Sequence, residues 1–210
     1  MAVEVGLTKD FLESVLKTKV YKFQVAPGDN GGFTCAVLEV DIWRTSSGNP
    51  EHLIIKCFPS NPARQALLDS SGMFARELDV YRELIPGLLG FQKEFEFPEE
   101  LPFAPFVYGN YLSAVERSEL VTPMLSVENC IIMKNLGWMG FKLRDRFLAL
   151  DFDHYKLVIE AQARLHGISW AYKIKHGIKK LEDKYPFLAL AKLQGTLGIL
   201  AKFIHSNFTR

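Results

Sequence analysis

The sequence lacks long apolar runs, a marked excess of charge of either sign, and paired cysteines. No apolar stretch approaches the ~18 residues that a transmembrane helix needs, so we expect no membrane span. The 25 Lys and Arg residues nearly balance the 24 Asp and Glu residues, and without a strong positive field we do not expect a nucleic acid partner. The three cysteines, Cys35, Cys57 and Cys130, lie far apart in apolar segments, which is typical of free thiols and not of a metal site.

The composition favours a globular protein of a reducing compartment. Of the 210 residues, 48% are hydrophobic and 12% aromatic, which is enough to fill the core of one domain, or of one lobe and part of a second. The N-terminal segment carries charges at Glu4, Lys9, Asp10 and Glu13, whereas a secretion signal has an apolar centre. Free thiols are also typical of reducing conditions. We therefore expect a cytoplasmic protein.

Hydrophobic periodicity predicts a strand-rich first part and a helical second part. A short helix capped by Thr8 comes first, and a longer helix is expected from Met73 to Leu88. Strand signals lie at residues 20–25, 33–43, 52–58, 106–112, 120–124 and 130–133, and we expect a five-stranded antiparallel sheet. Helical stripes follow at 157–172 and 187–208. This grouping indicates an α+β fold divided into residues 1–136 and 137–210.

Two charged residues occupy positions where apolar residues are expected. Lys56 shares a face of its predicted strand with Ile54, and Glu77 lies within the apolar stripe of the predicted helix over 73–88. A buried charge without a partner is costly, so each residue is the obvious partner of the other. Alternatively, Lys56 extends to solvent from an edge strand and Glu77 reaches water, and spacing alone does not choose between these interpretations. The order of parts, with a glycine-rich turn, a strand lysine and a helix glutamate, favours the pair because it is typical of kinase-like phosphotransferases.

Five segments together resemble the ecdysteroid kinase-like (CHK kinase-like) family. They are GDNGGF at 28–33, LIIKCFP at 53–59, FARELDVY at 74–81, PFVY at 105–108 and LHGIS at 165–169. The resemblance implies a protein-kinase-like N-terminal lobe followed by a truncated helical C-terminal lobe. It also implies ATP and magnesium as cofactors, and transfer of the γ-phosphoryl group to the hydroxyl of a small molecule, an ecdysteroid in the named members.

The same resemblance assigns roles to individual residues. Lys56 would bind the phosphates of ATP, and Glu77 would hold Lys56. The turn over the phosphates would comprise Gly28, Asp29, Asn30, Gly31 and Gly32, although an ordinary Asn-Gly hairpin turn explains this cluster equally well. The hinge that meets adenine through its backbone would include Met133 and Asn135. The family commonly carries an acidic residue where this chain has Lys134, so side-chain contacts at the hinge are not expected.

The catalytic motifs of the family do not occur in this sequence. The His-Gly-Asp and Asp-Phe motifs would follow the helix that contains His166, and neither is present before Arg210. Asp151 and Asp153 flank Phe152 in a segment like the metal motif, but they precede that helix, where aspartate is typical of a cap. We therefore expect no magnesium ligands in this chain, and an N-terminal part of an ATP-dependent small-molecule kinase that is inactive alone.

Two other functions remain open from the sequence. One is a non-catalytic, truncated relative that binds nucleotide or a partner chain, and the other, less supported, is a sterol or lipid carrier. Helical stripes such as Leu157, Ala161 and Leu165 lack an obvious cover, which predicts self-association through this surface.

Overall fold

The computed structural model describes residues 6–27, 35–97, 101, 103–120, 126–145 and 147–189. These residues fall into two compact units, which we call the sheet unit and the helical unit. The sheet unit draws its described residues from 6–78 and 105–135, and the helical unit draws its residues from 79–104 and 136–189. A compact unit is not necessarily a domain that folds by itself, so the expected division into domains 1–136 and 137–210 stays a prediction.

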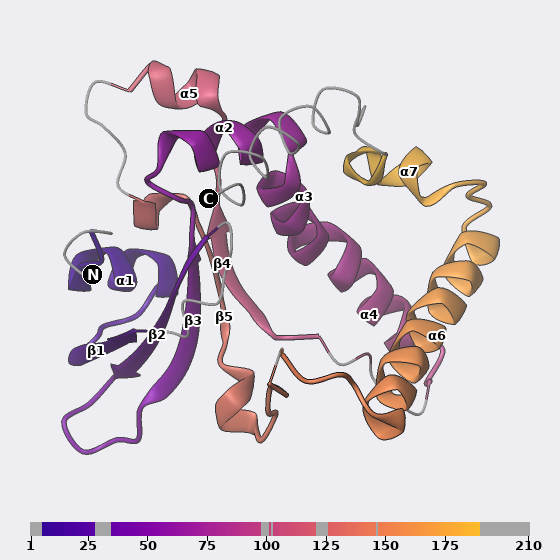
Figure 1. The fold of residues 1–210 in the computed structure, drawn as a ribbon, viewed down its shortest axis with the longest axis horizontal. Helices are drawn as coiled ribbons and strands as arrows, with labels where there is room; N and C mark the ends of the chain where they lie inside the picture. The colour runs from indigo at the N-terminus through magenta and orange to yellow at the C-terminus, as the bar shows by residue number, and fades with distance from the viewer. Residues whose placement is uncertain are drawn as a thin grey trace. The chain divides into compact units, whose positions relative to one another are not determined.

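A five-stranded antiparallel sheet forms the centre of the sheet unit (Figure 1). Its strands are β1 (Lys22–Pro27), β2 (Ala36–Trp43), β3 (Glu51–Cys57), β4 (Phe106–Asn110) and β5 (Cys130–Lys134). They lie in the order β1-β2-β3-β5-β4, and each neighbouring pair is antiparallel. The predicted sheet and the α+β class are therefore confirmed.

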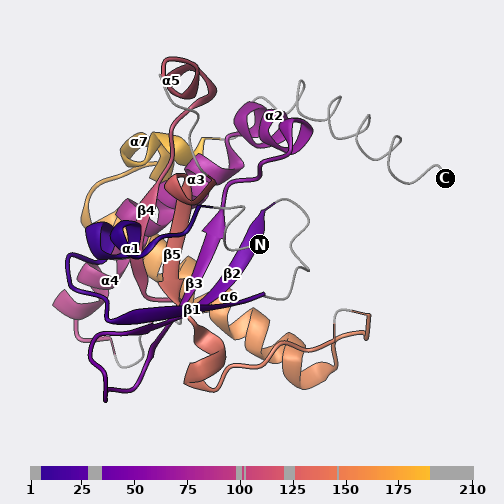
Figure 2. The same cartoon turned by 90° about the vertical axis from the view of Figure 1, so that its left-hand side faces the viewer.

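Alternation along the strands builds the core of this unit. Leu38, Val40 and Ile42 of β2 are buried on one face, where they join Leu53 and Ile55 of β3 in a single hydrophobic cluster. Helix α1 (Lys9–Leu16) contributes to the same cluster and lies beside the sheet (Figures 1 and 2). As predicted, its N-cap is Thr8, whose hydroxyl oxygen accepts a hydrogen bond of 3.1 Å from the backbone N–H of Phe11.

Three further helices belong to the sheet unit. They are α2 (Pro62–Ser71), α3 (Met73–Asp79) and α5 (Ala114–Ser118), with a short 3-10 turn, η2, at Ser126–Glu128. Gly72 separates α2 from α3 in the left-handed conformation, with φ of 63°, and its N–H donates to the carbonyl of Leu68. An L side chain is strained in this conformation, so glycine lets one helix follow the other directly.

The helical unit continues the chain from α3. Its elements are the π-helical segment η1 (Val80–Leu84), α4 (Ile85–Glu94), η3 (Leu136–Met139), α6 (Phe152–Lys175), α7 (Leu181–Lys184) and η4 (Pro186–Leu188). The helix predicted over 73–88 thus continues as far as Glu94. Its core contains Leu88, Phe91, Ile168, Tyr172 and Tyr185. Residues 28–32, most of the strand expected at 120–124 and most of the helix expected at 187–208 lie outside the described residues.

Among the residues that the structure describes, the buried residues of α6 lie near its C-terminal end. Ile168 is 7% exposed and Tyr172 is 3% exposed, whereas Leu157 in the first half of the helix is 66% exposed. The helix is long, yet within the described part of the chain no helix is apolar enough over a sufficient length to cross a membrane.

Candidate functional site

Lys56 and Glu77 form an ion pair in the sheet unit. The Nζ atom of Lys56 donates to Oε2 of Glu77 over 2.5 Å. The side chains of Lys56 and Glu77 are 25% and 34% exposed, so the pair is partly buried and still accessible to solvent. The contact between Lys56 and Glu77, predicted because both residues occupy positions where apolar residues are expected, is confirmed.

The sequence places each member of the pair by simple periodicity. Ile55 and Cys57 on β3 are buried in the core, so Lys56 between them projects from the other face of the sheet. On α3, Phe74 and Leu78 are 1% and 2% exposed, and their packing brings Glu77 of the same helix to the sheet. A carboxylate on the helix thus lies against an ammonium on the strand.

The pair is suited to binding an anion. An ammonium has three N–H donors, and the contact with Glu77 uses one of them. A negative group near Lys56 would be attracted to a positive charge that is already held in one place, so little ordering entropy would be lost on binding. The contact with Glu77 favours the rotamer of Lys56 that places Nζ at the carboxylate.

The predicted hinge lies at the end of β5, between β3 and β4. Met133 belongs to the strand and pairs with Ile54 and Phe106. The backbone N–H of Asn135 donates to the carbonyl of His52 over 3.0 Å, so this N–H is already used within the sheet unit. Asn135 is 9% exposed, and its side chain donates weakly to Glu39 over 3.4 Å.

Lys134 has a structural role at this hinge. Its Nζ contacts Oε1 of Glu51, while the other carboxylate oxygen of Glu51 accepts from Arg44 over 2.5 Å. Burial acts to raise the pKa of the Glu51 carboxyl, but the hydrogen bonds from Lys134 and Arg44 outweigh burial and lower this pKa overall. The basic residue that departs from the family pattern is thus neutralised by an acidic residue on the neighbouring strand.

The proposed phosphate turn, Gly28 to Gly32, lies outside the described residues. The two strands that it joins are described, and they form a hairpin in which Lys22 pairs with Trp43 and Pro27 pairs with Leu38. The role of Asp29, Asn30 and the glycines therefore stays a prediction.

The residues described do not fit a magnesium site. Among them, no group of three or more His, Cys, Asp or Glu side chains is arranged to hold a metal ion. Asp151 is the N-cap of α6, as its position indicated, because its Oδ1 accepts from the backbone N–H of His154 over 3.0 Å. Its second oxygen accepts from Arg144 over 2.7 Å. A hydrogen bond from the His154 side chain is the largest cause that lowers the pKa of Asp151 to about 2.

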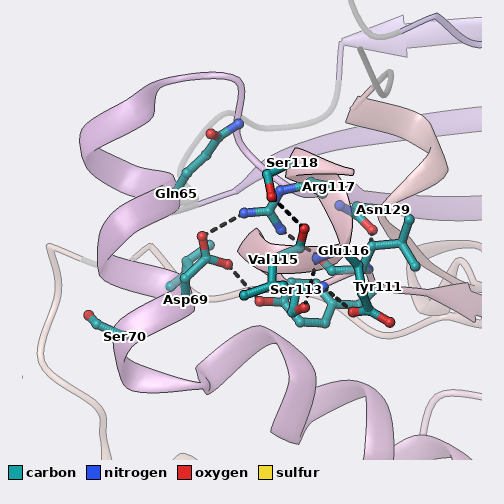
Figure 3. Close-up of polar contacts among 12 residues, drawn as sticks. Gln65, Asp69, Ser70, Tyr111, Ser113, Val115, Glu116, Arg117, Ser118 and Asn129 are labelled. Atoms are coloured by element: carbon teal, nitrogen blue, oxygen red, sulfur yellow. Dashed lines mark hydrogen bonds and ion pairs between the residues drawn. The ribbon is translucent and has the colours of Figure 1, made fainter. Parts of the chain in front are cut away.

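A cluster of polar residues beside α2 was not expected from the sequence. Asp69 of α2 accepts a hydrogen bond of 2.6 Å from the hydroxyl of Tyr111 and one of 2.5 Å from Arg117 of α5 (Figure 3). Asp69 and Arg117 are separated by 48 positions in the sequence. Aspartate and arginine are ordinary residues of exposed helices, so no local pattern marks them as a pair.

Comparison with known proteins identifies the family. Residues 27–195 match the model of the ecdysteroid kinase-like family, and this span includes both members of the ion pair. No curated protein and no solved structure matches the chain. The family match extends over more than half of the sequence and is consistent with the antiparallel sheet and helices. The chain therefore belongs to the ecdysteroid kinase-like family.

Proposed function

We propose that this chain binds ATP as part of a small-molecule phosphotransferase, with Lys56 contacting the α- and β-phosphates. The observation that carries the proposal is the 2.5 Å contact between Lys56 and Glu77. Such a pair on a strand and a helix is the arrangement that positions ATP phosphates in kinase-like enzymes. Membership of a kinase-like family supports the same proposal.

The pair would bind the triphosphate by electrostatic attraction. At an effective dielectric constant of about 20, an ammonium and a phosphate oxygen ~4 Å apart attract each other by about 4 kcal/mol before the cost of desolvation. The carboxylate of Glu77 holds the ammonium, so this attraction would act on one position of the triphosphate. ATP would supply the phosphoryl group, and the acceptor would be the hydroxyl of a small molecule such as an ecdysteroid. No step that depends on magnesium is assigned to the described residues.

A second candidate is a relative that binds nucleotide without transferring phosphate. The position of Asp151 favours it, because the carboxylate most like a metal ligand in the sequence caps α6 and pairs with Arg144. Both candidates predict ATP binding, and they differ only in turnover. Because this chain alone is expected to be inactive in both cases, the test is the reading frame that follows Arg210. His-Gly-Asp and Asp-Phe motifs there, with release of ADP by the longer chain in the presence of magnesium and an ecdysteroid, would support the first candidate, and their absence would support the second.

The decisive experiment measures ATP affinity by isothermal titration calorimetry. We expect Lys56→Met to weaken binding by about tenfold or more, equivalent to at least ~1.4 kcal/mol of binding free energy. Lys9→Met is the matched control, because Lys9 also forms an ion pair in the sheet unit, at 3.9 Å from Glu13, but lies on α1. Equal affinities for wild type and Lys56→Met would contradict the proposal, as would an equal loss in the control.

A charge exchange separates binding from stability. The double variant Lys56→Glu with Glu77→Lys restores opposite charges but moves the ammonium from the strand to the helix. We expect it to recover much of the stability that Lys56→Glu alone loses, while ATP affinity stays low. Recovery of full affinity would show that the position of the ammonium is unimportant.

A further inference from the structure

The guanidinium of Arg117 connects three parts of the sheet unit. It donates to Oδ2 of Asp69 on α2 over 2.5 Å and to the backbone carbonyl of Leu112 over 2.5 Å. It also lies over the ring of Phe58, with its carbon atom 4.7 Å from the ring centre. The Arg117 and Asp69 side chains are only 16% and 19% exposed, and Figure 3 shows Arg117 reaching toward Asp69 from α5. A planar cation at these positions can satisfy two acceptors and stack on an aromatic ring at once.

Phe58 belongs to an aromatic cluster with Phe74 and Tyr111. The rings of Phe58 and Phe74 meet edge to face, with centres 5.3 Å apart at 84°. Tyr111 lies 5.5 Å from Phe58 and 5.7 Å from Phe74, measured between ring centres. Phe58 and Phe74 are 2% and 1% exposed, so the contact is part of the packed interior.

The aromatic cluster lies next to the ion pair along both elements. Phe58 follows Lys56 by two residues, just past the end of β3, and Phe74 precedes Glu77 by three residues, one helical turn earlier on α3. A side chain one turn away on a helix shares its face, as does a side chain two residues away on an extended chain. The packing of Phe58 on Phe74 thus sets the spacing between strand and helix at which Lys56 and Glu77 meet.

We infer that Arg117 is a positioning residue for the Lys56–Glu77 pair and acts through Phe58 and Asp69. The inference deepens the proposed function and rests on it where nucleotide binding is concerned. Arg117 contacts the ring of Phe58, which follows Lys56 in the chain. Through Asp69 it also contacts α2, the helix that precedes α3 and Glu77. Loss of the guanidinium would remove a contact from each side of the pair.

Tyr111 completes the arrangement. Its hydroxyl donates to Oδ1 of Asp69 over 2.6 Å, while its ring packs on Phe58 and Phe74. Burial, together with the neighbouring Asp69 carboxylate, raises the pKa of Tyr111 to about 12. The hydroxyl therefore keeps its proton at neutral pH, and both oxygens of Asp69 remain occupied by donors.

A spectroscopic test needs no nucleotide. The NMR signals of the Lys56 side chain, from the Nζ and Cε nuclei, report the contact with Glu77, and Glu77→Gln gives their positions when the charge pair is broken. We expect Arg117→Met to move these signals toward the Glu77→Gln positions. The matched control is Lys22→Met, since Lys22 also lies over an aromatic ring in the sheet unit, with its Nζ 4.2 Å from the centre of the Trp43 ring, and belongs neither to the aromatic cluster nor to the predicted hinge. Unmoved Lys56 signals in folded Arg117→Met would overturn the inference.

Nucleotide affinity provides the second measurement. We expect Arg117→Met to weaken ATP binding by about fivefold to tenfold and Lys22→Met to change it by less than about twofold, even at a similar loss of thermal stability. Arg117→Lys keeps a charge for Asp69 without the planar group over Phe58, so we expect it to recover more stability than affinity. If Arg117→Met does not fold, Arg117→Lys replaces it in both measurements. Lys56 signals at their wild-type positions, together with an unchanged ATP affinity, would then overturn the inference.

The two proposals fail in different ways. If wild type does not bind ATP, or binds it independently of Lys56, the proposed function fails, while the Lys56 signals still decide whether Arg117 positions the pair. If ATP binding depends on Lys56 but Arg117→Met leaves both the affinity and the signals unchanged, only the positioning role fails.

Discussion

Leu78 of α3 lies directly over Gly109 of β4. A Cβ atom built at Gly109 would stand 2.3 Å from Cδ1 of Leu78 and 3.2 Å from the backbone oxygen of Cys130. Leu78 is 2% exposed and immediately follows Glu77, so its side chain has little room to move aside. The absence of a side chain at position 109 therefore permits the close approach of α3 to the sheet.

Gly109→Ala tests this approach. We expect the variant to lose about 1–3 kcal/mol of unfolding free energy, because an extra methyl group overpacks the contact, and to bind ATP more weakly because Glu77 moves with α3. Urea denaturation and calorimetric titration measure the two effects. Gly90→Ala is the control: a Cβ there meets nothing within 4 Å, and we expect it to raise stability by about 0.5–1 kcal/mol in the interior of α4. Unchanged stability of Gly109→Ala would show that Leu78 repacks without cost.

The ion pair contributes a moderate share of stability. A fully buried pair loses about 3–5 kcal/mol when one partner is removed, and an exposed pair contributes ~0–1 kcal/mol. With side chains 25% and 34% exposed, Lys56 and Glu77 lie between these limits, and we expect Lys56→Met to cost about 1–2 kcal/mol. A double-mutant cycle with Glu77→Gln measures the coupling. Additive losses from the two single variants would contradict direct interaction.

Stability should fall in acid partly because of Glu51. Its folded-state pKa lies below the ordinary value of 4.5, so the folded protein holds the carboxylate more readily than the unfolded chain does. This contribution is fully present above the unfolded pKa and is lost as pH falls through the folded pKa. We expect Glu51→Gln to destabilise the protein near pH 7, and its difference from wild type to shrink below about pH 4. Urea titrations across this range measure it, and a difference independent of pH would argue against an ionised Glu51.

The helical unit exposes many large apolar side chains. Examples on α6 are Leu157, Trp170 and Ile174, which are 66%, 68% and 66% exposed. We propose that the chain self-associates through this surface, because apolar side chains so exposed gain from being covered. Sedimentation velocity should show association for wild type and less for Leu157→Lys with Ile174→Lys. Lys156→Glu, on the same helix, is the control for charge alone. A monomer at all concentrations would contradict the proposal.

Local patterns were sufficient for several elements. Alternation located β2 and β3 to within three residues of their observed ends, and the cap and spacing located α1. The helix from Met73 was also predicted, but with its end at Leu88 and not at Glu94. The chain instead passes through the π-helical segment at Val80–Leu84, and Pro86 then falls in the first turn of α4, where its missing N–H is tolerated.

Helix α2 was missed because its apolar pattern is weak. Its best signals were at its ends: Asn61 caps it through a 3.1 Å hydrogen bond to the N–H of Arg64, Pro62 begins it and Gly72 ends it. These three residues follow the usual preferences for an N-cap, a first turn and a C-terminal glycine. These three residues alone were sufficient to predict a helix at residues 62–71, which includes Asp69.

The amino-acid sequence by itself determined the α+β class, the faces of β3 and α3, and the presence of opposite charges on those two faces. These properties follow from residue order at short range, through the two-residue period of a strand and the 3.6-residue period of a helix. Only the tertiary structure decided that Lys56 meets Glu77, that Arg117 contacts Phe58 and Asp69, and that Gly109 lies beneath Leu78. Those contacts join residues far apart in the chain, and periodicity gives the direction of a side chain without specifying which distant side chain it will meet.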